Sequence, residues 1–171
     1  MAETAFVVRV PEAEPHVSAL RRRFDPSARL GMPAHVTLLY PFMPPERITE
    51  AVISRAQLAA EGAAAFRYRL ARICRFEETL YLSVEPVEPF VALTRRLAEG
   101  FPQFPPYGGR HKDVVPHLTV AHGEPDVDRV ARELSPVLPA GGIEARCTEF
   151  VLMENSSGLW EVRQMFPLAV R

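Results

Sequence analysis

The chain has 171 residues, of which 47% are hydrophobic and 24% are charged. These proportions are typical of one globular domain and exclude a disordered, collagenous or coiled-coil protein. The formal net charge of −1 excludes a global basic surface for duplex DNA, and two cysteines are too few for a disulfide framework or a zinc ligand set.

The first residues and the hydropathy pattern bear on where the protein works. Residues 1–10, MAETAFVVRV, contain a short apolar run without a basic leader, which indicates a first strand and not a signal peptide. No stretch of the sequence approaches the roughly 18 apolar residues of a membrane span. We therefore expect a cytoplasmic protein that does not bind a membrane, and we separately expect a monomer.

The spacing of apolar residues and the positions of proline and glycine predict alternating strands and helices. The predicted elements are a strand at 5–10, a helix at 12–24, a loop at 25–33, a strand at 35–42, a helix from Pro44 to Gly62, a hairpin of strands at 66–76 and 80–84, a helix at 90–101, a long loop at 102–116, a strand at 117–121, a helix at 127–137, and strands at 143–153 and 159–168 joined by a turn at 155–158. This mixture indicates an α+β protein.

The predicted elements repeat once along the chain. The order strand, helix, loop, His-strand, helix, strand occurs over residues 5–76 and again over residues 80–154, and the strand at 159–168 follows. This period is too long for a solenoid. We predict a single α+β domain over residues 1–171 with two pseudo-twofold-related lobes, each with an antiparallel sheet and flanking helices, around a central cleft.

Two short motifs open the two predicted His-strands, HVTL at residues 35–38 and HLTV at residues 117–120. Residues i and i+2 of a strand project from the same face, so each histidine lies beside a threonine hydroxyl. Two such strands facing one cleft suit phosphodiester cleavage, because one imidazole accepts a proton from the nucleophile and the other donates one to the leaving oxygen. The hydroxyls can then bind the non-bridging oxygens. The predicted catalytic residues are His35, Thr37, His117 and Thr119.

A third sequence of this kind, HVSA at residues 16–19, competes with the two motifs. It lies in the predicted helix at 12–24, where residues i and i+2 do not share a face, so we interpret His16 as a surface histidine. For His35 and His117 the alternative is a pair of core histidines, which the strand context and the repeat disfavour. The near-twofold arrangement leaves open which of the two is the base and which is the acid.

The two motifs together resemble those of the 2H phosphoesterase superfamily. The stretch MPAHVTLLYPF at residues 32–42 is similar to the first motif of the bacterial 2′-5′ RNA ligase-like branch, and VPHLTV at residues 115–120 resembles its second motif. The resemblance implies a bilobal α+β fold and a metal-independent phosphodiesterase without a cofactor. It also implies substrates such as 2′,3′-cyclic nucleotides, RNA ends with a cyclic phosphate, or 2′-5′ linkages.

Other residues near the motifs are candidates for substrate binding. Tyr40 and Phe42 either line the cleft or pack in the core. Tyr107 could stack on a base or anchor its loop, and the basic residues at 110–112 either contact a phosphate or form a solvated loop. Many relatives carry a basic residue, commonly arginine, after the second motif, whereas this chain has a histidine there. The predicted substrate-binding residues are Tyr40, Phe42, Tyr107, Arg110 and His122.

Three classes of function remain open from the sequence. The first is a metal-free phosphodiesterase acting on a small nucleotide or an RNA end with a cyclic phosphate. The second is a non-catalytic module that holds a nucleotide or phosphorylated ligand in the same cleft. The third is a hydrolase with acyl or metal chemistry. It is disfavoured because the sequence has no nucleophile-elbow motif, and the spacings of His111, His117 and His122 match no metal-ligand pattern.

Overall fold

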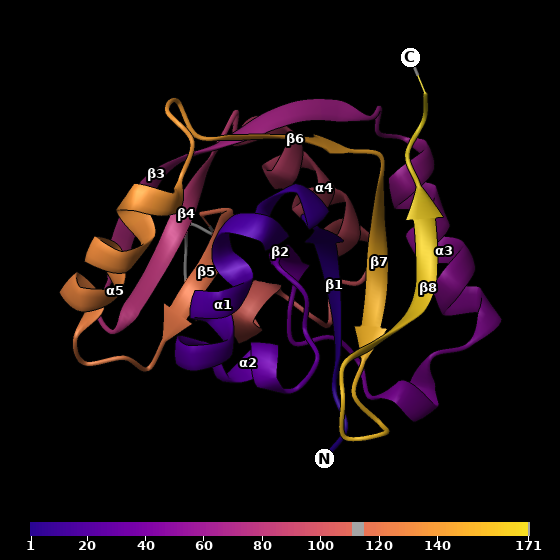
Figure 1. The fold of residues 1–171 in the computed structure, drawn as a ribbon. Coiled ribbons are helices and arrows are strands. Elements are labelled where there is room, and N and C mark those ends of the chain that lie inside the picture. Colours follow the sequence, from indigo (N-terminus) through magenta and orange to yellow (C-terminus); the bar gives the residue numbers. More distant parts are fainter. Residues whose placement is uncertain (111–114, 171) are drawn as a thin grey trace.

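In a computed structural model, which describes residues 1–110 and 115–170, the chain forms two four-stranded antiparallel sheets with helices around them (Figure 1). The strands are β1 (Thr4–Arg9), β2 (His35–Leu39), β3 (Phe66–Phe76), β4 (Thr79–Glu85), β5 (His117–His122), β6 (Ile143–Cys147), β7 (Glu149–Glu154) and β8 (Glu161–Pro167). The helices are α1 (Glu14–Phe24), α2 (Pro26–Arg29), α3 (Glu50–Glu61), α4 (Glu88–Gly100) and α5 (Val127–Leu134), with short 3₁₀ turns η1 (Pro11–Ala13), η2 (Pro45–Arg47), η3 (Pro106–Gly109) and η4 (Ser135–Val137). The predicted α+β class is confirmed.

Each sheet combines strands from both halves of the chain. The strand orders are β2-β1-β7-β8 and β5-β4-β3-β6. The first two strands of each repeat pair with each other, β1 with β2 and β4 with β5, but β3 pairs with β4 and β7 pairs with β1. The ranges 5–76 and 80–154 expected for the lobes therefore do not coincide with the two sheets. Strand pairing is a long-range choice that the order of elements does not determine.

The strand predicted at 143–153 is two strands in the structure. β6 forms the edge of the second sheet beside β3, the backbone leaves the ladder at Thr148, and β7 then runs between β1 and β8. In Figure 1 this orange segment passes along the top of the molecule as β6 and then turns down as β7. The segment thus connects the two sheets directly.

Two boundaries in the first half differ from the prediction because side chains cap the helices. Helix α3 begins at Glu50 and not near Pro44, since the Thr49 hydroxyl accepts a hydrogen bond from a backbone N–H of the first turn. The loop predicted at 25–33 contains the short helix α2, and the side chain of Asp25 caps it. Helix ends depend on local hydrogen bonds from capping side chains. The spacing of apolar residues does not show these bonds, so it did not predict the two boundaries.

Each sheet is covered by a pair of helices. α3 and α4 pack on the first sheet, at β8 and β2, whereas α1 and α5 pack on the second, at β5 and β4. Helix α1 therefore follows β1 of the first sheet along the chain but packs on the second sheet. Helix α4 follows β4 of the second sheet but packs on the first. One continuous hydrophobic core joins the helices to both sheets. Within the described ranges, no helix has the length and apolar character needed to cross a membrane.

We predict that Phe6→Ala lowers the free energy of unfolding by about 3–5 kcal/mol, because the cavity left by a buried ring is not refilled. Phe6 is fully buried in β1, and its ring lies 4.7 Å from that of Phe42 and 5.9 Å from that of Phe150, centroid to centroid. Urea unfolding followed by circular dichroism measures the loss. The exposed Leu58→Ala is the control, and equal stabilities of the two variants would contradict the central place of Phe6.

Candidate active site

A cavity of about 720 Å³ lies between the two sheets, and the four predicted catalytic residues line it. His35 and Thr37 come from β2, at the edge of the first sheet, and His117 and Thr119 come from β5, at the edge of the second. The two edge strands contact each other. The fold thus brings together two motifs that lie far apart in the sequence.

Alternating burial along the two strands directs the motif side chains. Val36 and Leu38 in β2, and Leu118 and Val120 in β5, are at most 1% exposed and belong to the core. The histidine and threonine of each motif are half-buried on the opposite face. Since successive side chains of a strand point to opposite faces, burying the apolar residues places both polar pairs in the cavity.

A backbone carbonyl orients each imidazole in the same way. Nδ1 of His35 lies 2.7 Å from the carbonyl oxygen of Pro33, and Nδ1 of His117 lies 2.7 Å from that of Val115. A carbonyl only accepts, so Nδ1 donates in both rings, and Nε2 is the atom that exchanges a proton. These two carbonyls were not predicted from the motifs. A proline lies close before each histidine, Pro33 two residues before His35 and Pro116 directly before His117, and it restricts the backbone that enters the strand.

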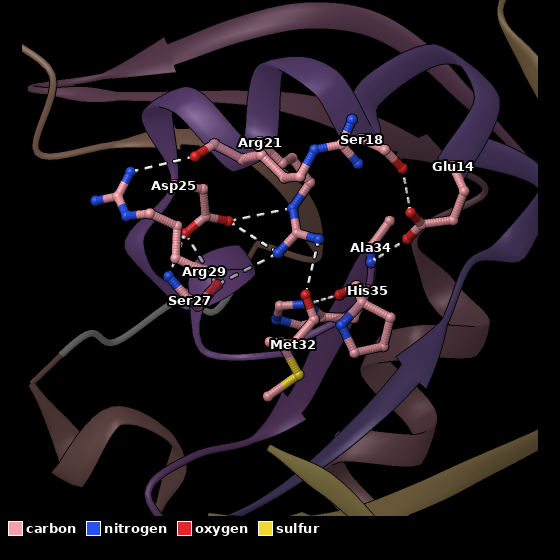
Figure 2. A network of polar contacts seen from close by, with 11 residues as sticks. Glu14, Ser18, Arg21, Asp25, Ser27, Arg29, Met32, Ala34 and His35 are labelled. Carbon is pink, nitrogen blue, oxygen red and sulfur yellow. Dashed lines mark hydrogen bonds and ion pairs between the residues drawn. The ribbon is translucent and has the colours of Figure 1, made fainter. Parts of the chain in front are cut away.

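A buried ion pair lies behind His35 (Figure 2). Nε and Nη2 of Arg21 donate to Oδ2 of Asp25 at 3.2 and 3.0 Å, and both residues are at most 3% exposed. Nη1 of Arg21 donates to the carbonyl of Met32 at 2.9 Å, and Asp25 accepts hydrogen bonds from the amide and hydroxyl of Ser27. The network fastens the segment that enters β2, and with it the carbonyl that orients the imidazole.

Burial lowers the pKa of His35 from its ordinary 6.5 to about 4. The hydrogen bond to Pro33 opposes this shift, whereas the positive charge of Arg21 adds to it, with smaller contributions from Asp25, which raises the pKa, and His117, which lowers it. Although the ring keeps some contact with the cavity, the protein packed around it penalises the charged form. His35 is therefore neutral at neutral pH, with Nε2 ready to accept a proton.

The predicted substrate-binding residues separate into two groups. Tyr40, Tyr107 and His122 line the cavity. Phe42 is not among the residues that line the cavity, and of the two alternatives stated for it the structure has core packing. It is 6% exposed and packs in the core against Phe6, because β2 ends before it and the chain turns there, so that its side chain is directed inward.

The basic loop contributes less to the described site than the sequence suggested. Arg110 is exposed and is not among the described residues that line the cavity, so a contact with a substrate stays a prediction for it. His111 and Lys112 lie outside the described residues. His16 is in helix α1, as interpreted from its spacing, where Nδ1 lies 2.9 Å from the carbonyl of Val137.

Aromatic residues that the motif analysis did not select also line the cavity, among them Tyr81 and Trp160. Tyr81 pairs with Thr119 across the ladder, and its ring centroid is 5.1 Å from that of His117. In the predicted strand, Tyr81 lies between Leu80 and Leu82. This alternation places Tyr81 on the face opposite the two leucines, so the sequence did contain a signal for its position. Trp160 lies just before β8, and no local pattern connects it with either motif.

The charged lining residues outside the imidazoles are carboxylates. Glu3, Asp25 and Glu77 line the cavity, and no arginine or lysine does so within residues 1–110 and 115–170. In the same ranges, no three His, Cys, Asp or Glu side chains gather as a metal-binding group. The polar groups that the described cavity offers to a ligand, apart from the carboxylates, therefore include hydroxyls, ring N–H groups and imidazoles.

Comparison with known sequences identifies the family. Residues 10–159 match the sequence profile of the 2′-5′ RNA ligase superfamily. The chain belongs to this superfamily. The resemblance to the 2H phosphoesterases stated from the two motifs is thereby confirmed.

Related bacterial sequences carry the name "Putative phosphoesterase". One from Bacillus pumilus is 32% identical over 111 residues, and one from Bacillus cytotoxicus is 28% identical over 114 residues. The matches cover 61% and 65% of this chain and 60% and 63% of those proteins. The superfamily member described here thus spans about three fifths of the length of these relatives.

Solved structures share the fold over nearly the whole chain. Escherichia coli LigT in complex with 3′-AMP has a TM-score of 0.65 at 16% identity, with 98% of each chain covered. TT0787 of Thermus thermophilus has a TM-score of 0.65 at 21% identity, with 97% of each chain covered. At these identities the likeness concerns the fold.

We predict that Arg21→Met lowers the free energy of unfolding by about 3–5 kcal/mol, because it leaves the carboxylate of Asp25 buried without its cation. Chemical denaturation at pH 7 measures this loss. The matched control is Arg23→Met, which breaks the ion pair of the exposed Arg23 with Glu133 and should change stability little. Similar losses in the two variants would contradict the structural role of the buried pair.

Proposed function

We propose that the protein is a metal-independent phosphodiesterase that hydrolyses a 2′,3′-cyclic phosphate, or a 2′-5′ linkage, of a nucleotide or RNA end. The observation that carries the proposal is the matched pair of imidazoles in one cavity. Each is oriented through Nδ1 by a carbonyl 2.7 Å away, and each has a threonine two residues further along its strand. Such a pair supplies a base and an acid without a cofactor.

The difference between the surroundings of the two histidines supports the following roles for them in the proposed hydrolysis of a cyclic phosphate. His35 is neutral and accepts a proton through Nε2 from a water molecule that attacks phosphorus. The bond from phosphorus to one ribose oxygen breaks, and His117 in its protonated form donates the proton that this oxygen takes up. The product is a nucleoside monophosphate, and exchange with solvent returns both imidazoles to their starting forms.

The two threonines hold the phosphoryl group in this mechanism. A hydroxyl donates one hydrogen bond, and Thr37 and Thr119 can each donate to a non-bridging oxygen from opposite walls of the cavity. Donors placed where negative charge develops stabilise the transition state more than the ground state.

The cavity supports a substrate of nucleotide size. A volume of about 720 Å³ lies within the usual range for small-molecule sites, and the rings of Tyr81 and Trp160 offer surfaces on which a base can stack. Structures of LigT, which shares this fold, are in complex with 3′-AMP, ATP and NADP⁺. These ligands support a nucleotide as the substrate of this protein as well.

The second candidate is a non-catalytic module that binds a nucleotide or phosphorylated ligand in the same cavity. The same hydroxyls and ring N–H groups would hold such a ligand. A low pKa at His35 favours catalysis over this alternative, because simple anion binding gains from a protonated imidazole, whereas a general base must be neutral.

We predict that the purified protein converts 2′,3′-cyclic nucleotides to monophosphates in excess chelator, and that His35→Ala and His117→Ala each lower kcat by at least about 100-fold. Chromatography of the products measures the rates and identifies the ribose oxygen that leaves. His16→Ala, on helix α1, is the matched control and should leave the rate unchanged.

Binding of 3′-AMP by calorimetry, without turnover of any 2′,3′-cyclic nucleotide, would replace this proposal by the binding module. Loss of turnover on chelation, with recovery on adding a stoichiometric metal, would contradict the metal-independent mechanism. Full activity in either single histidine variant would remove that histidine from the mechanism.

We predict that kcat/KM falls on the acidic side near pH 4, well below the ordinary histidine value. A base works only when deprotonated, so activity is present above the pKa of His35, about 4, and is lost as the pH falls through it. Circular dichroism at each pH shows whether the protein remains folded.

The residual activities of the two histidine variants, measured across pH, show which histidine causes the loss of activity on the acidic side. His117→Ala should keep a limb near pH 4, because His35 remains, and His35→Ala should lose it. An acidic limb that persists unchanged in His35→Ala would contradict the assignment of His35 as the base.

A further inference from the structure

One peptide group leads the chain into β2 and orients the first imidazole. Its carbonyl oxygen, that of Pro33, accepts a hydrogen bond from Nδ1 of His35 at 2.7 Å. The N–H of Ala34 belongs to the same peptide group, and a peptide group is planar and rigid. The direction of the carbonyl that holds the imidazole is therefore set by whatever holds the N–H at the other end of this group.

A carboxylate from helix α1 holds that N–H. Oε1 of Glu14 accepts a hydrogen bond from the N–H of Ala34 at 2.5 Å, and Oε2 of the same carboxylate accepts one from the hydroxyl of Ser18 (Figure 2). Both oxygens of the half-buried Glu14 thus have a donor, which fixes the carboxylate. A continuous chain of hydrogen bonds runs from this carboxylate through one peptide group to the ring of His35.

The same face of α1 also holds the preceding peptide group. Glu14, Ser18 and Arg21 are spaced at i, i+4 and i+7, which places them on one face of the helix. Nη1 of Arg21 donates to the carbonyl of Met32 at 2.9 Å. Two consecutive peptide groups at the start of β2 are therefore bound by side chains of one helix, and the second of them carries the carbonyl that orients His35.

The other backbone groups of residues 32–34 are already engaged. The N–H of Met32 donates to the carbonyl of Ser27 at 3.0 Å, and the carbonyl of Ala34 accepts from the N–H of Val10 at 2.8 Å. Ala34 is fully buried, and a buried N–H without an acceptor is costly. If the Glu14 carboxylate were withdrawn, we therefore expect the peptide group to turn and take the Pro33 carbonyl with it.

We propose that Glu14 is a positioning residue that fixes the orientation and tautomer of His35 through this peptide group. Glu14 is not among the described residues that line the cavity, so it acts through the backbone and not on a ligand. Holding the proton on Nδ1 leaves Nε2 free to accept one. This inference rests on the proposed function, in which His35 is the general base.

The test compares two conservative variants of Glu14. Glu14→Gln loses the charge but keeps, at the same reach, an oxygen that accepts from the N–H of Ala34. Glu14→Asp keeps the charge but is one methylene shorter, which withdraws the acceptor. We expect Glu14→Asp to lower kcat for a 2′,3′-cyclic nucleotide about 10-fold with KM within about 2-fold, and Glu14→Gln to stay within about 3-fold of the wild type.

Nitrogen-15 NMR of the imidazole rings measures the positioning itself. At about pH 8 histidine is ordinarily neutral, and protonated and unprotonated ring nitrogens have well separated shifts. The signals of His35 are those that disappear in His35→Ala. The wild type and Glu14→Gln should carry the proton on Nδ1, whereas Glu14→Asp should show a mixture of the two tautomers.

The matched control is Glu12→Asp. Oε2 of Glu12 accepts a hydrogen bond from the backbone N–H of Arg146 at 2.8 Å, which is the same type of bond made to a strand that does not line the described cavity. This variant should leave kcat and the His35 tautomer unchanged even if it lowers the melting temperature. Thermal unfolding of every variant identifies losses that come from misfolding.

The outcomes separate this inference from the proposed function. Turnover with a His35 tautomer that does not depend on Glu14 would overturn the inference and leave the phosphodiesterase proposal standing. A tautomer that depends on Glu14, without turnover of any 2′,3′-cyclic nucleotide, would support the positioning and remove the proposed activity.

Three further results would overturn the positioning role of Glu14. The first is a wild-type His35 that carries its proton on Nε2, which needs no variant to be observed. The second is an equal loss in Glu14→Gln and Glu14→Asp, because it would make the charge responsible and not the hydrogen bond to the backbone. The third is the same tautomer mixture in Glu12→Asp, because it would follow from a general loss of stability.

Discussion

The site depends on the two-residue period of two edge strands. Val36 and Leu38 in β2 and the equivalent apolar residues in β5 are buried in one core. That burial is the largest favourable contribution available to these strands, and it fixes the direction of every intervening side chain. A shift of register by one residue would place histidine and threonine in the core and apolar residues in the cavity. The hydrophobic core therefore holds the chemical groups in place.

The two histidines of the site are oriented in the same way but have different neighbouring residues. Each histidine follows a proline-containing segment and is oriented by the carbonyl two residues before it. Behind His35, however, lies the buried pair of Arg21 and Asp25, whereas His117 lies against the ring of Tyr81. Burial and the nearby guanidinium keep His35 neutral. A near-twofold scaffold thus provides two imidazoles in different surroundings.

The charges of the cavity limit how it can treat an anionic ligand. Within the described residues, the charged lining groups apart from imidazoles are carboxylates such as Glu3 and Glu77. Fixed cations would attract polyanions through long-range forces, and the described walls do not supply them. A phosphoryl group is met there by short-range donors. The fit of such a group to these walls then depends on the geometry of hydroxyls and ring N–H groups.

The sequence by itself determined the α+β class, the helical and strand patterns, and the pairing of each histidine with a threonine, because these follow from local periodicity. It did not determine that the strand at 143–153 divides at Thr148 between two sheets. Nor did it determine that Phe42 turns into the core, or that Glu14 and Arg21 bind the backbone that enters β2. These features arise from contacts between residues distant in the chain. Such contacts depend on which surfaces meet on packing, and only the tertiary structure decides that.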